Sequence, residues 1–335
     1  MKKRIAINGF GRIGRLVLRA LLERQECDLE VVAINDLADP ETSAHLLRYD
    51  SVHGPLTESC TLEGEFLKGD GFSIRMLSER DPSKLPWQEM NVDLVMECSG
   101  IFTKKEKASA HLKAGAKKVL ISAPSPDADQ TIVYGVNDHV LTAQDIIVSN
   151  ASCTTNCLAP VAATLDQTVG IESGYMTTIH AYTGDQSLID RAHSDLRRAR
   201  AGALSLIPTS TGAAKAVGLV LPQLEGKLDG TAIRLPTANV SLVDFTFRTP
   251  AKTTVEAINK AMEDAAKGPL KGVLGINSAP LVSTDFNHNP HSSIFDVTQT
   301  QVVQGQFCRI LSWYDNEWGF SNRMLDTATV MTQLG

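Results

Sequence analysis

The N-terminal segment combines a short apolar run, a glycine-rich turn and a helical pattern. Residues 4–7 form the apolar run, Asn8-Gly9-Phe10-Gly11-Arg12-Ile13-Gly14 follows at once, and residues 15–24 carry the helical spacing. The glycines at positions 9, 11 and 14 fit a dinucleotide-binding turn: one permits the bend, one lets backbone amides approach a pyrophosphate, and one allows close helix–strand packing. A strand, a glycine turn and a helix in this order predict the start of a doubly wound parallel sheet.

A second apolar run, residues 29–34, ends in Asn35-Asp36. An acidic residue about 20 positions beyond such glycines can bind the ribose hydroxyls of a dinucleotide. Asp36 therefore favours NAD over NADP. A glycine-rich turn with an aspartate that merely closes a strand is the alternative that the residues leave open here.

The alternation of strands and helices continues to about residue 150. We expect strands at 92–97, 117–122, 131–136 and 145–148 and a helix at 104–114. Arg80 and Ser122 lie at a loop and a strand end, where open α/β sheets bind their ligands, although either could be a solvated loop residue. The first part of the chain is thus predicted to be an α/β domain of the Rossmann type.

Long strand patterns dominate the second half, at residues 175–182, 231–235, 240–247, 281–286, 293–303 and 307–314. They predict a mostly antiparallel sheet with helices on one face, an α+β domain. Residues 322–334 form an amphipathic helical pattern that we expect to pack back on the first domain. The predicted division is 1–152 for the NAD-binding domain, 153–315 for the catalytic domain and 316–335 for the C-terminal helix.

Length and composition limit the class of protein. A chain of 335 residues usually needs two cores, and a net charge of −6 offers no overall electrostatic footprint for nucleic acid or an anionic membrane. No apolar run approaches the roughly 20 residues of a membrane span. Six scattered cysteines indicate reduced thiols, so we expect the cytoplasm as the compartment. Cys153 and Cys157 lack the spacing of zinc sites, and no metal is expected.

The stretch Ser149 to Cys157, SNASCTTNC, places a cysteine between polar residues where a strand gives way to a helix. The unpaired amides and the dipole of a helix N-terminus favour a thiolate, so we expect the pKa of Cys153 to be lowered. A lone intracellular cysteine is more often a small buried hydrophobe. The polar neighbours, which suit an anionic site better than a core, favour a nucleophile.

Three features of the second half complement this cysteine. His180 ends the apolar strand MTTIHAY; it is either a core histidine or the base that a cysteine nucleophile needs. Arg198 lies in a basic run followed by PTSTGAAK, which indicates either a solvated helix face or an anion site. Arg234 lies in the apolar strand AIRLP and needs an anionic partner, either a ligand or a structural acid.

Together these segments resemble phosphorylating glyceraldehyde-3-phosphate dehydrogenases. The matching motifs, in order, are NGFGRIGR, IND, SNASCTTNC, TTIHAYTGDQ, DLRRARA, PTSTGAAKAVG and SWYDNEWGFSNR. The resemblance runs essentially from end to end. It implies oxidation of glyceraldehyde 3-phosphate with NAD and inorganic phosphate through a cysteine thiohemiacetal and thioester, in glycolysis or gluconeogenesis, by a cytoplasmic homotetramer.

The resemblance also implies roles for individual residues. Cys153 would be the nucleophile and His180 its base. One phosphate site would use Thr183 and Arg234, and the other Ser152, Thr154, Thr211 and Gly212 with Arg198 nearby. Contacts to NAD would come from Gly9, Gly11, Arg12, Ile13, Gly14, Asp36, Arg80, Ser122 and Asn316.

Three alternatives stay open at this stage. The segment at Arg191-Ala192 lacks the Leu-Pro pair associated with strictly NAD-dependent members, so NADP use is possible, although Asp36 would repel a 2′-phosphate. The segments DFNHNPHSS and NEWGF also resemble erythrose-4-phosphate dehydrogenases, while TSTGAAKAVG favours the triose enzyme. From another class, the chain could be a catalytically idle redox sensor or nucleotide-binding scaffold, which would need neither His180 nor two anion sites.

Overall fold

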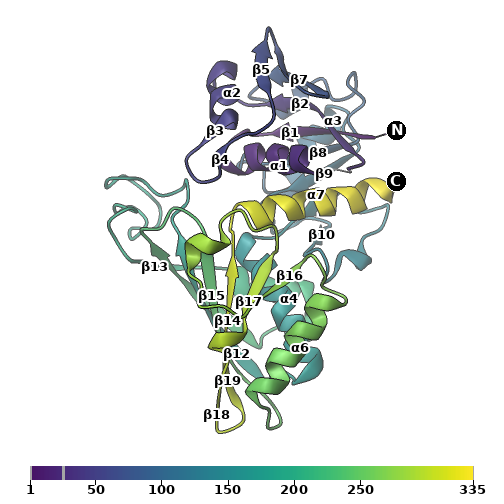
Figure 1. Ribbon diagram of the computed structural model, residues 1–335. Coiled ribbons are helices and arrows are strands. Elements are labelled where there is room, and N and C mark those ends of the chain that lie inside the picture. Colours follow the sequence, from purple (N-terminus) through teal and green to yellow (C-terminus); the bar gives the residue numbers. More distant parts are fainter. Residues whose placement is uncertain (1, 25–26, 335) are drawn as a thin grey trace. The chain divides into compact units, whose positions relative to one another are not determined.

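The structure, a computed structural model, describes residues 2–24 and 27–334. It contains two compact units (Figure 1). The first unit comprises Met1–Ile132, Asp138–Ala151 and Ser321–Gly335, and the second comprises Val133–Asn137 and Ser152–Phe320. The functional limits expected from the sequence, at 152/153 and 315/316, remain a prediction.

The first unit is built on a nine-stranded sheet in the order β10-β11-β9-β8-β1-β2-β7-β6-β5. Its strands are β1 Lys3–Asn8, β2 Leu29–Asn35, β5 Cys60–Glu63, β6 Phe66–Gly69, β7 Phe72–Leu77, β8 Leu94–Glu97, β9 Lys118–Ile121, β10 Gln130–Thr131 and β11 Ile147–Ser149. All pairings from β10 to β7 are parallel, and β5 and β6 add an antiparallel edge. This arrangement confirms the expected doubly wound parallel sheet.

A parallel sheet is buried on both faces, so its strands consist of nearly continuous apolar residues. Ile5, Ile7, Leu94 and Met96 are wholly buried along β1 and β8. The unit also contains α1 Arg12–Glu23, α2 Pro40–Arg48, α3 Lys105–Lys113 and the small pair β3 Tyr49–Asp50 and β4 Gly54–Pro55. Since the strands are parallel, their carboxyl ends meet at one edge, where β1, β2 and β8 end at Asn8, Asn35 and Glu97.

The C-terminal helix, α7 Trp318–Gln333, has its residues from Ser321 onward in the first unit. Lys118 on β9 donates from Nζ to the carbonyl of Met331 at 2.8 Å, which satisfies a backbone oxygen near the helix end. Thr327 donates from its hydroxyl to Asn150 Oδ1 at 2.8 Å. The helix is thereby attached to β9 and to the segment after β11.

The second unit is built on an eight-stranded sheet in the order β13-β14-β12-β15-β19-β17-β16, with β18 also paired to β19. The strands are β12 Ser173–Ala181, β13 Ile207–Ser210, β14 Leu228–Leu235, β15 Ser241–Arg248, β16 Leu274–Asn277, β17 Ser293–Asp296, β18 Gln301–Val303 and β19 Phe307–Tyr314. Among the described strands of this second sheet, only β12 with β14 and β16 with β17 pair in parallel. The sheet is therefore mixed but mostly antiparallel, as expected.

Three helices accompany this sheet: α4 Cys153–Thr168, α5 Ala213–Val220 and α6 Val255–Lys267. α4 contacts both α5 and α6 as well as β17 and β19, while α5 contacts β14 and α6 contacts β16. Figure 1 shows α4 and α6 side by side at the sheet. This packing places the first turn of α4 beside the ends of β12 and β19.

Three strand predictions were wrong or only partly right. Residues 281–286 contain a 3-10 helix, Ser283–Phe286, because Asp285 accepts the Val282 amide at 2.8 Å and closes a turn. The expected strand at 293–303 is divided into β17 and β18 because Asp296 caps a turn through the Thr298 amide. Of residues 131–136, only Thr131 belongs to a strand, β10.

Candidate active site

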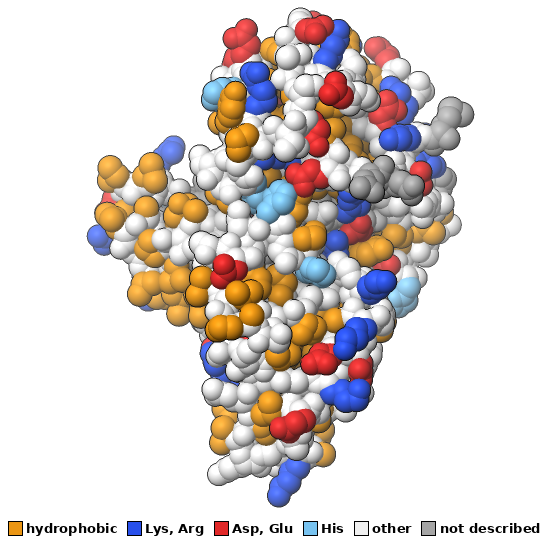
Figure 2. All heavy atoms as spheres, in the orientation of Figure 1, with side chains coloured by type: hydrophobic (Ala, Val, Ile, Leu, Met, Phe, Trp, Pro, Cys, Tyr) orange, Lys and Arg blue, Asp and Glu red, His pale blue; other side chains and the backbone are white. Residues whose placement is uncertain are grey.

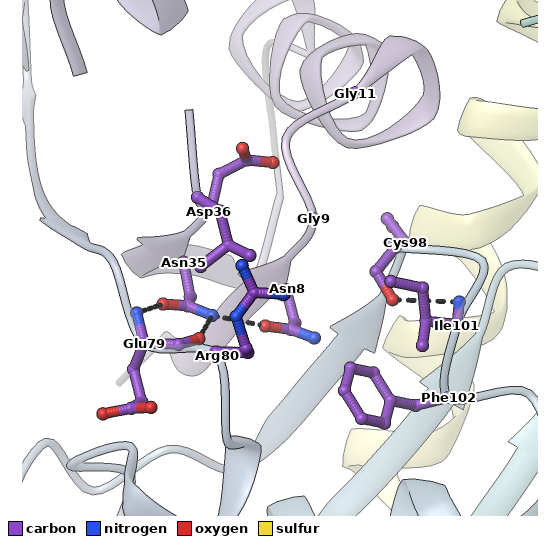
Figure 3. A pocket seen from close by; sticks show the side chains of 12 residues that line it. Asn8, Gly9, Gly11, Asn35, Asp36, Glu79, Arg80, Cys98, Ile101 and Phe102 are labelled. Atoms are coloured by element: carbon purple, nitrogen blue, oxygen red, sulfur yellow. Dashed lines mark hydrogen bonds between the residues drawn. The ribbon is translucent and has the colours of Figure 1, made fainter. Parts of the chain in front are cut away.

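A cavity of about 400 Å³ opens at the carboxyl edge of the first sheet (Figure 3). It is lined by Asn8, Gly9, Gly11, Asn35, Asp36, Leu37, Glu79, Arg80, Cys98, Ser99, Ile101 and Phe102. These residues follow β1, β2, β7 and β8, so four strand ends contribute to one hollow. Its size and its position outside the strand ends are those of a nucleotide site in an open α/β sheet.

The three glycines of the first turn meet different surroundings. Gly9 has φ +92°, and a Cβ there would lie 2.5 Å from the Ser99 amide nitrogen. A Cβ on Gly14 would lie 2.1 Å from the Gly9 carbonyl oxygen, so α1 can start against the turn only without a side chain. A Cβ on Gly11 would meet no atom within 4 Å. No atom of the described residues therefore requires glycine at position 11, and the open space before its backbone suits a pyrophosphate.

Asp36 lines the cavity at the end of β2. Its Oδ2 accepts the Phe10 amide at 2.5 Å and its Oδ1 accepts the Ala38 amide at 2.8 Å. The carboxylate therefore fixes the glycine turn and remains partly exposed. Arg80, also in the lining, has an exposed side chain. The cavity thus fits NAD: a bare backbone at Gly11, an acid at the end of β2, and a guanidinium at the rim.

The other residues expected at NAD lie outside this lining. Arg12 forms an ion pair with Asp50. Burial alone would raise the pKa of Asp50, but hydrogen bonds to its carboxylate and the charge of Arg12 lower this pKa to about 2. Ile13 and Gly14 belong to the first turn of α1, and Ser122 follows β9. Asn316 belongs to the second unit, where its Oδ1 accepts the Ser241 hydroxyl at 2.8 Å.

The candidate nucleophile is the first residue of α4. Ser152 is its N-cap and accepts the Thr155 amide through Oγ at 3.1 Å. Thr154 is buried and shares a 2.8 Å hydrogen bond with the hydroxyl of Tyr314. Capping and burial of these hydroxyls hold the first turn of the helix and, with it, the thiol of Cys153.

The thiol faces an imidazole of defined tautomer. Cys153 Sγ lies 3.5 Å from His180 Nε2, and His180 Nδ1 lies 2.7 Å from the carbonyl oxygen of Ala181. Two groups lie at Nδ1: the Ala181 carbonyl, which only accepts, and Arg234 NH1, which only donates and is farther away at 3.4 Å. The shorter contact to the carbonyl places the hydrogen on Nδ1, so Nε2 presents its lone pair to the sulfur. The Tyr314 ring packs edge-on against the imidazole at 5.9 Å between centroids. The pair has the geometry of a nucleophile with its base.

Burial disfavours the charged forms of both Cys153 and His180. Burial raises the pKa of Cys153, and the positive charge of Arg234 and the hydrogen bonds at Thr154 offset only part of this effect. Burial, then the Arg234 charge, lowers the pKa of His180 to about 3. The expected lowering of the Cys153 pKa was therefore wrong for this structure, because desolvation outweighs the Arg234 charge and the hydrogen bonds that favour the thiolate. Burial thus favours the thiol of Cys153 and the neutral imidazole of His180 over the charged pair.

The first candidate anion site surrounds Arg234. Its NH1 donates to Thr183 Oγ1 at 2.8 Å and to the Ala181 carbonyl at 3.2 Å, while its Nε is buried without a hydrogen-bond partner in the described structure. Thr183 in turn donates to Asp185, which accepts Arg198 NH1 at 2.9 Å. The structure thus brings Thr183, Arg198 and Arg234 together around one carboxylate.

Asp185 was not singled out from the sequence, although it lies in the TGDQ motif. Burial alone would raise the pKa of Asp185, but the Thr183 hydrogen bond and the charges of Arg234 and Arg198 together lower it. The ionised carboxylate orients Arg198 directly and Arg234 through the Thr183 hydroxyl. The sequence did contain a signal for Asp185: it lies two residues after Thr183, and Arg198 and Arg234 both needed an anionic partner.

The second candidate anion site lies where two helices begin. Gly212 is the N-cap of α5, and Thr211 accepts the Ala213 amide through Oγ1 at 3.2 Å. Thr155 donates to the Ala213 carbonyl at 3.5 Å, so the N-termini of α4 and α5 adjoin. Arg198 is held close by through Thr209 at 3.0 Å and the Ser210 carbonyl at 3.3 Å. Two helix N-termini and one arginine can hold a dianion.

Two negative findings concern the described residues alone. Among them, no group of three or more His, Cys, Asp or Glu side chains is placed to hold a metal ion. None of the described helices is long and apolar enough to cross a membrane.

Comparison with known proteins gives consistent results for both units. Residues 3–105 match the model for the family described as "Glyceraldehyde 3-phosphate dehydrogenase, NAD binding domain", and residues 152–316 match "Glyceraldehyde 3-phosphate dehydrogenase, C-terminal domain". The chain is 62% identical to the glyceraldehyde-3-phosphate dehydrogenase of Cereibacter sphaeroides and 59% identical to that of Xanthobacter flavus. It is 52% identical to glyceraldehyde-3-phosphate dehydrogenase 1 of Bacillus subtilis. Each match covers the whole of both chains.

Proposed function

The chain belongs to the glyceraldehyde-3-phosphate dehydrogenase family, and from this premise we propose the residues that carry out the reaction. Its activity is the NAD-dependent oxidation of glyceraldehyde 3-phosphate in glycolysis and gluconeogenesis. The observation that carries the residue assignment is the 3.5 Å approach of Cys153 Sγ to the unprotonated nitrogen of His180.

In the proposed first step, Cys153 adds to the aldehyde carbon of the substrate. The sulfur–carbon bond forms as the thiol proton passes to His180 Nε2, and that proton then completes the hydroxyl of the thiohemiacetal. His180 can take part in this exchange because Nε2 is unprotonated at neutral pH and lies 3.5 Å from the sulfur. Bound NAD supplies the hydride acceptor.

In the second step, His180 takes the hydroxyl proton as the thiohemiacetal is oxidised to a thioester. Inorganic phosphate then attacks the thioester carbonyl, and the carbon–sulfur bond breaks to release the acyl phosphate. The departing sulfur recovers the proton from the imidazolium. Proton removal by a positioned base typically raises the rate by roughly 10²- to 10⁴-fold.

We assign the substrate phosphate to Thr183 and Arg234 and the attacking phosphate to Ser152, Thr154, Thr211 and Gly212, with Arg198 between the two sites. The buried Nε of Arg234 supports the first assignment because an unpartnered guanidinium nitrogen suits a phosphate oxygen. Adjoining helix N-termini support the second. The residues proposed to contact NAD are Gly9, Gly11, Arg12, Ile13, Gly14, Asp36, Arg80, Ser122 and Asn316.

The decisive experiment compares two aldehydes with and without inorganic phosphate. We expect phosphate-dependent reduction of NAD with glyceraldehyde 3-phosphate and a much lower kcat/KM with erythrose 4-phosphate. A Cys153→Ser variant should bind NAD and lose oxidation, whereas replacement of the buried Cys308 by Ser should preserve it. Preference for erythrose 4-phosphate, or full activity of the Cys153 variant, would overturn the assignment.

Coenzyme choice has its own test. Asp36 at the ribose end of the cavity repels a 2′-phosphate, so we expect a higher kcat/KM with NAD than with NADP. Preference for NADP would show that Arg191 or another cation outweighs Asp36. We also propose a cytoplasmic homotetramer, whose assembly is tested by the native mass of the protein.

A further inference from the structure

A buried polar chain lies beneath the nucleotide cavity of the first unit. It joins Trp87, His111, Glu97, Asn8 and Asn35, all of which are at most 4% exposed. None of the residues expected from the sequence to bind NAD belongs to this chain. Burying such a chain costs free energy unless every polar group has a hydrogen-bond partner, so each donor must face an acceptor.

One end of the chain is fixed by an indole. Trp87 Nε1 can only donate, and it lies 3.1 Å from His111 Nδ1, so Nδ1 is the acceptor. His111 Nε2 therefore carries the hydrogen and donates to Glu97 Oε2 at 2.9 Å. A doubly protonated His111 would place two donors face to face at Trp87. His111 is thus a neutral ring of one tautomer.

The other end is fixed by backbone groups. Asn35 accepts the Glu79 amide through Oδ1 at 2.8 Å and donates from Nδ2 to the Glu79 carbonyl at 2.9 Å, which sets its orientation. The same Nδ2 donates to Asn8 Oδ1 at 2.8 Å, so Asn8 presents Nδ2 to Glu97 Oε2 at 2.6 Å. Figure 3 shows the links from Asn8 through Asn35 to Glu79 at the edge of the cavity.

Two chains of donors therefore converge on Glu97. Its second oxygen, Oε1, accepts the Ser99 amide at 2.8 Å and also the Ser99 hydroxyl. Four donors surround one carboxylate, and only an ionised, acceptor-only group satisfies all of them. An amide in its place would leave at least one buried donor facing an NH₂ group.

The hydrogen bonds that converge on Glu97 hold the walls of the nucleotide cavity. Asn8, Asn35, Glu79 and Ser99 all line the cavity and come from four separate segments. Gly9 passes so close to Ser99 that a single Cβ would collide with it, so the spacing of these segments has little tolerance. We propose that Glu97, oriented by neutral His111 and Trp87, is a positioning residue that fixes the walls of the NAD cavity before the cofactor binds.

This arrangement predicts a loss of cofactor affinity without a loss of chemistry. A Glu97→Gln variant should bind NAD about tenfold more weakly or worse, the size expected for losing hydrogen bonds to a buried charge. At saturating NAD its kcat should stay within about twofold of the wild type, because Cys153 and His180 belong to the second unit. The exposed Glu89, changed to Gln, is the matched control and should alter neither quantity.

Two substitutions of His111 test its tautomer directly. The amide of a His111→Gln variant can accept from Trp87 and donate to Glu97, as the neutral ring does, whereas a His111→Leu variant can do neither. We expect the Gln variant to bind NAD within about threefold of the wild type and the Leu variant to be weakened about as much as Glu97→Gln. This pair stays informative if Glu97→Gln fails to fold.

The dissociation constant for NAD would be measured by calorimetry on protein whose folded fraction is determined by circular dichroism. A merely structural role would lower Tm while leaving NAD affinity per folded site unchanged, and that result would overturn the proposal. Equal affinities of the His111→Gln and His111→Leu variants would overturn it as well.

Discussion

Among single residues, Arg234 has the largest electrostatic influence on the nucleophile. Its charge is the leading effect that lowers the pKa of Cys153 against burial. An Arg234→Gln variant should therefore have a higher thiol pKa and a smaller thiolate fraction at neutral pH. We expect slower inactivation by iodoacetamide at pH 7 to 8, and rates that approach those of the wild type in strong alkali.

The rate of alkylation against pH, without substrate, isolates this effect from phosphate binding. Arg309→Gln is the control, because Arg309 lies in the same unit but pairs with Asp244 at 2.8 Å. An unchanged profile in the Arg234 variant would mean that the guanidinium does not act on the thiol.

His180 links folding to pH. Its folded-state pKa of about 3 lies below the ordinary value of 6.5, so below pH 6.5 the unfolded chain binds a proton that the folded chain refuses. Stability is therefore fully present above pH 6.5 and is lost as the pH falls from 6.5 toward 3. The contribution to the slope approaches roughly 1.4 kcal/mol per pH unit.

A His180→Asn variant removes this linkage. Its free energy of unfolding, measured with urea at several pH values, should fall less steeply between pH 6 and pH 4 than that of the wild type. The exposed His139, changed to Asn, should leave the slope as it is. Equal slopes for the wild type and the His180 variant would show that the buried imidazole charges without penalty.

At the scale of elements, two glycines at the start of α1 have different roles: Gly14 is needed for folding, whereas Gly11 is expected to matter only for cofactor binding. Gly14→Ala places a methyl group 2.1 Å from the Gly9 carbonyl and should lower Tm by several degrees or prevent folding. Gly11→Ala meets no protein atom within 4 Å, so its Tm should stay close to that of the wild type. If a pyrophosphate approaches Gly11, the added methyl group should still weaken NAD binding.

Calorimetric titration with NAD and a thermal melt on both variants test this separation. Normal NAD affinity in the Gly11 variant would place the pyrophosphate elsewhere.

Elements with strong local patterns were predictable from the sequence. The strands β1, β2 and β8 and the helix α4 follow from apolar runs and spacing. The 281–286 prediction failed because the Asp285 carboxylate bonds to the nearby backbone, and Val282 is 60% exposed instead of pairing in a sheet. The parallel pairing of β12 with β14 depends on contacts between residues more than 50 positions apart, which no local pattern encodes.

The candidate site likewise combines features that the local sequence predicts with features that depend on tertiary contacts. Residue types and order pointed to Cys153, His180 and Arg234, since each is chemically out of place in its segment. Their pKa shifts were not predictable, because burial arises only from tertiary packing. Asp185 and Glu97 were missed for a related reason: each acts through partners brought together by several elements.

For the whole molecule, the segment after β12 carries an unusual surface. Five of its aliphatic side chains are between 67 and 83% exposed: Leu188, Ile189, Leu196, Leu204 and Leu206. Figure 2 shows hydrophobic side chains gathered on the lobe beside β13. Clusters of this kind usually mark a protein–protein interface, which supports the proposed homotetramer.

The assembly proposal predicts a change of mass when this surface is made polar. Leu188→Glu with Leu204→Glu puts two charges where apolar contacts are expected, and covering one leucine side chain contributes roughly 1.5 kcal/mol or more. Sedimentation velocity should give about four chains for the wild type and a smaller assembly for the double variant at equal concentration. Val140→Glu, a 40% exposed position in the first unit, is the control and should keep the wild-type mass. A monomeric wild type would contradict the homotetramer and leave the exposed leucines to another partner.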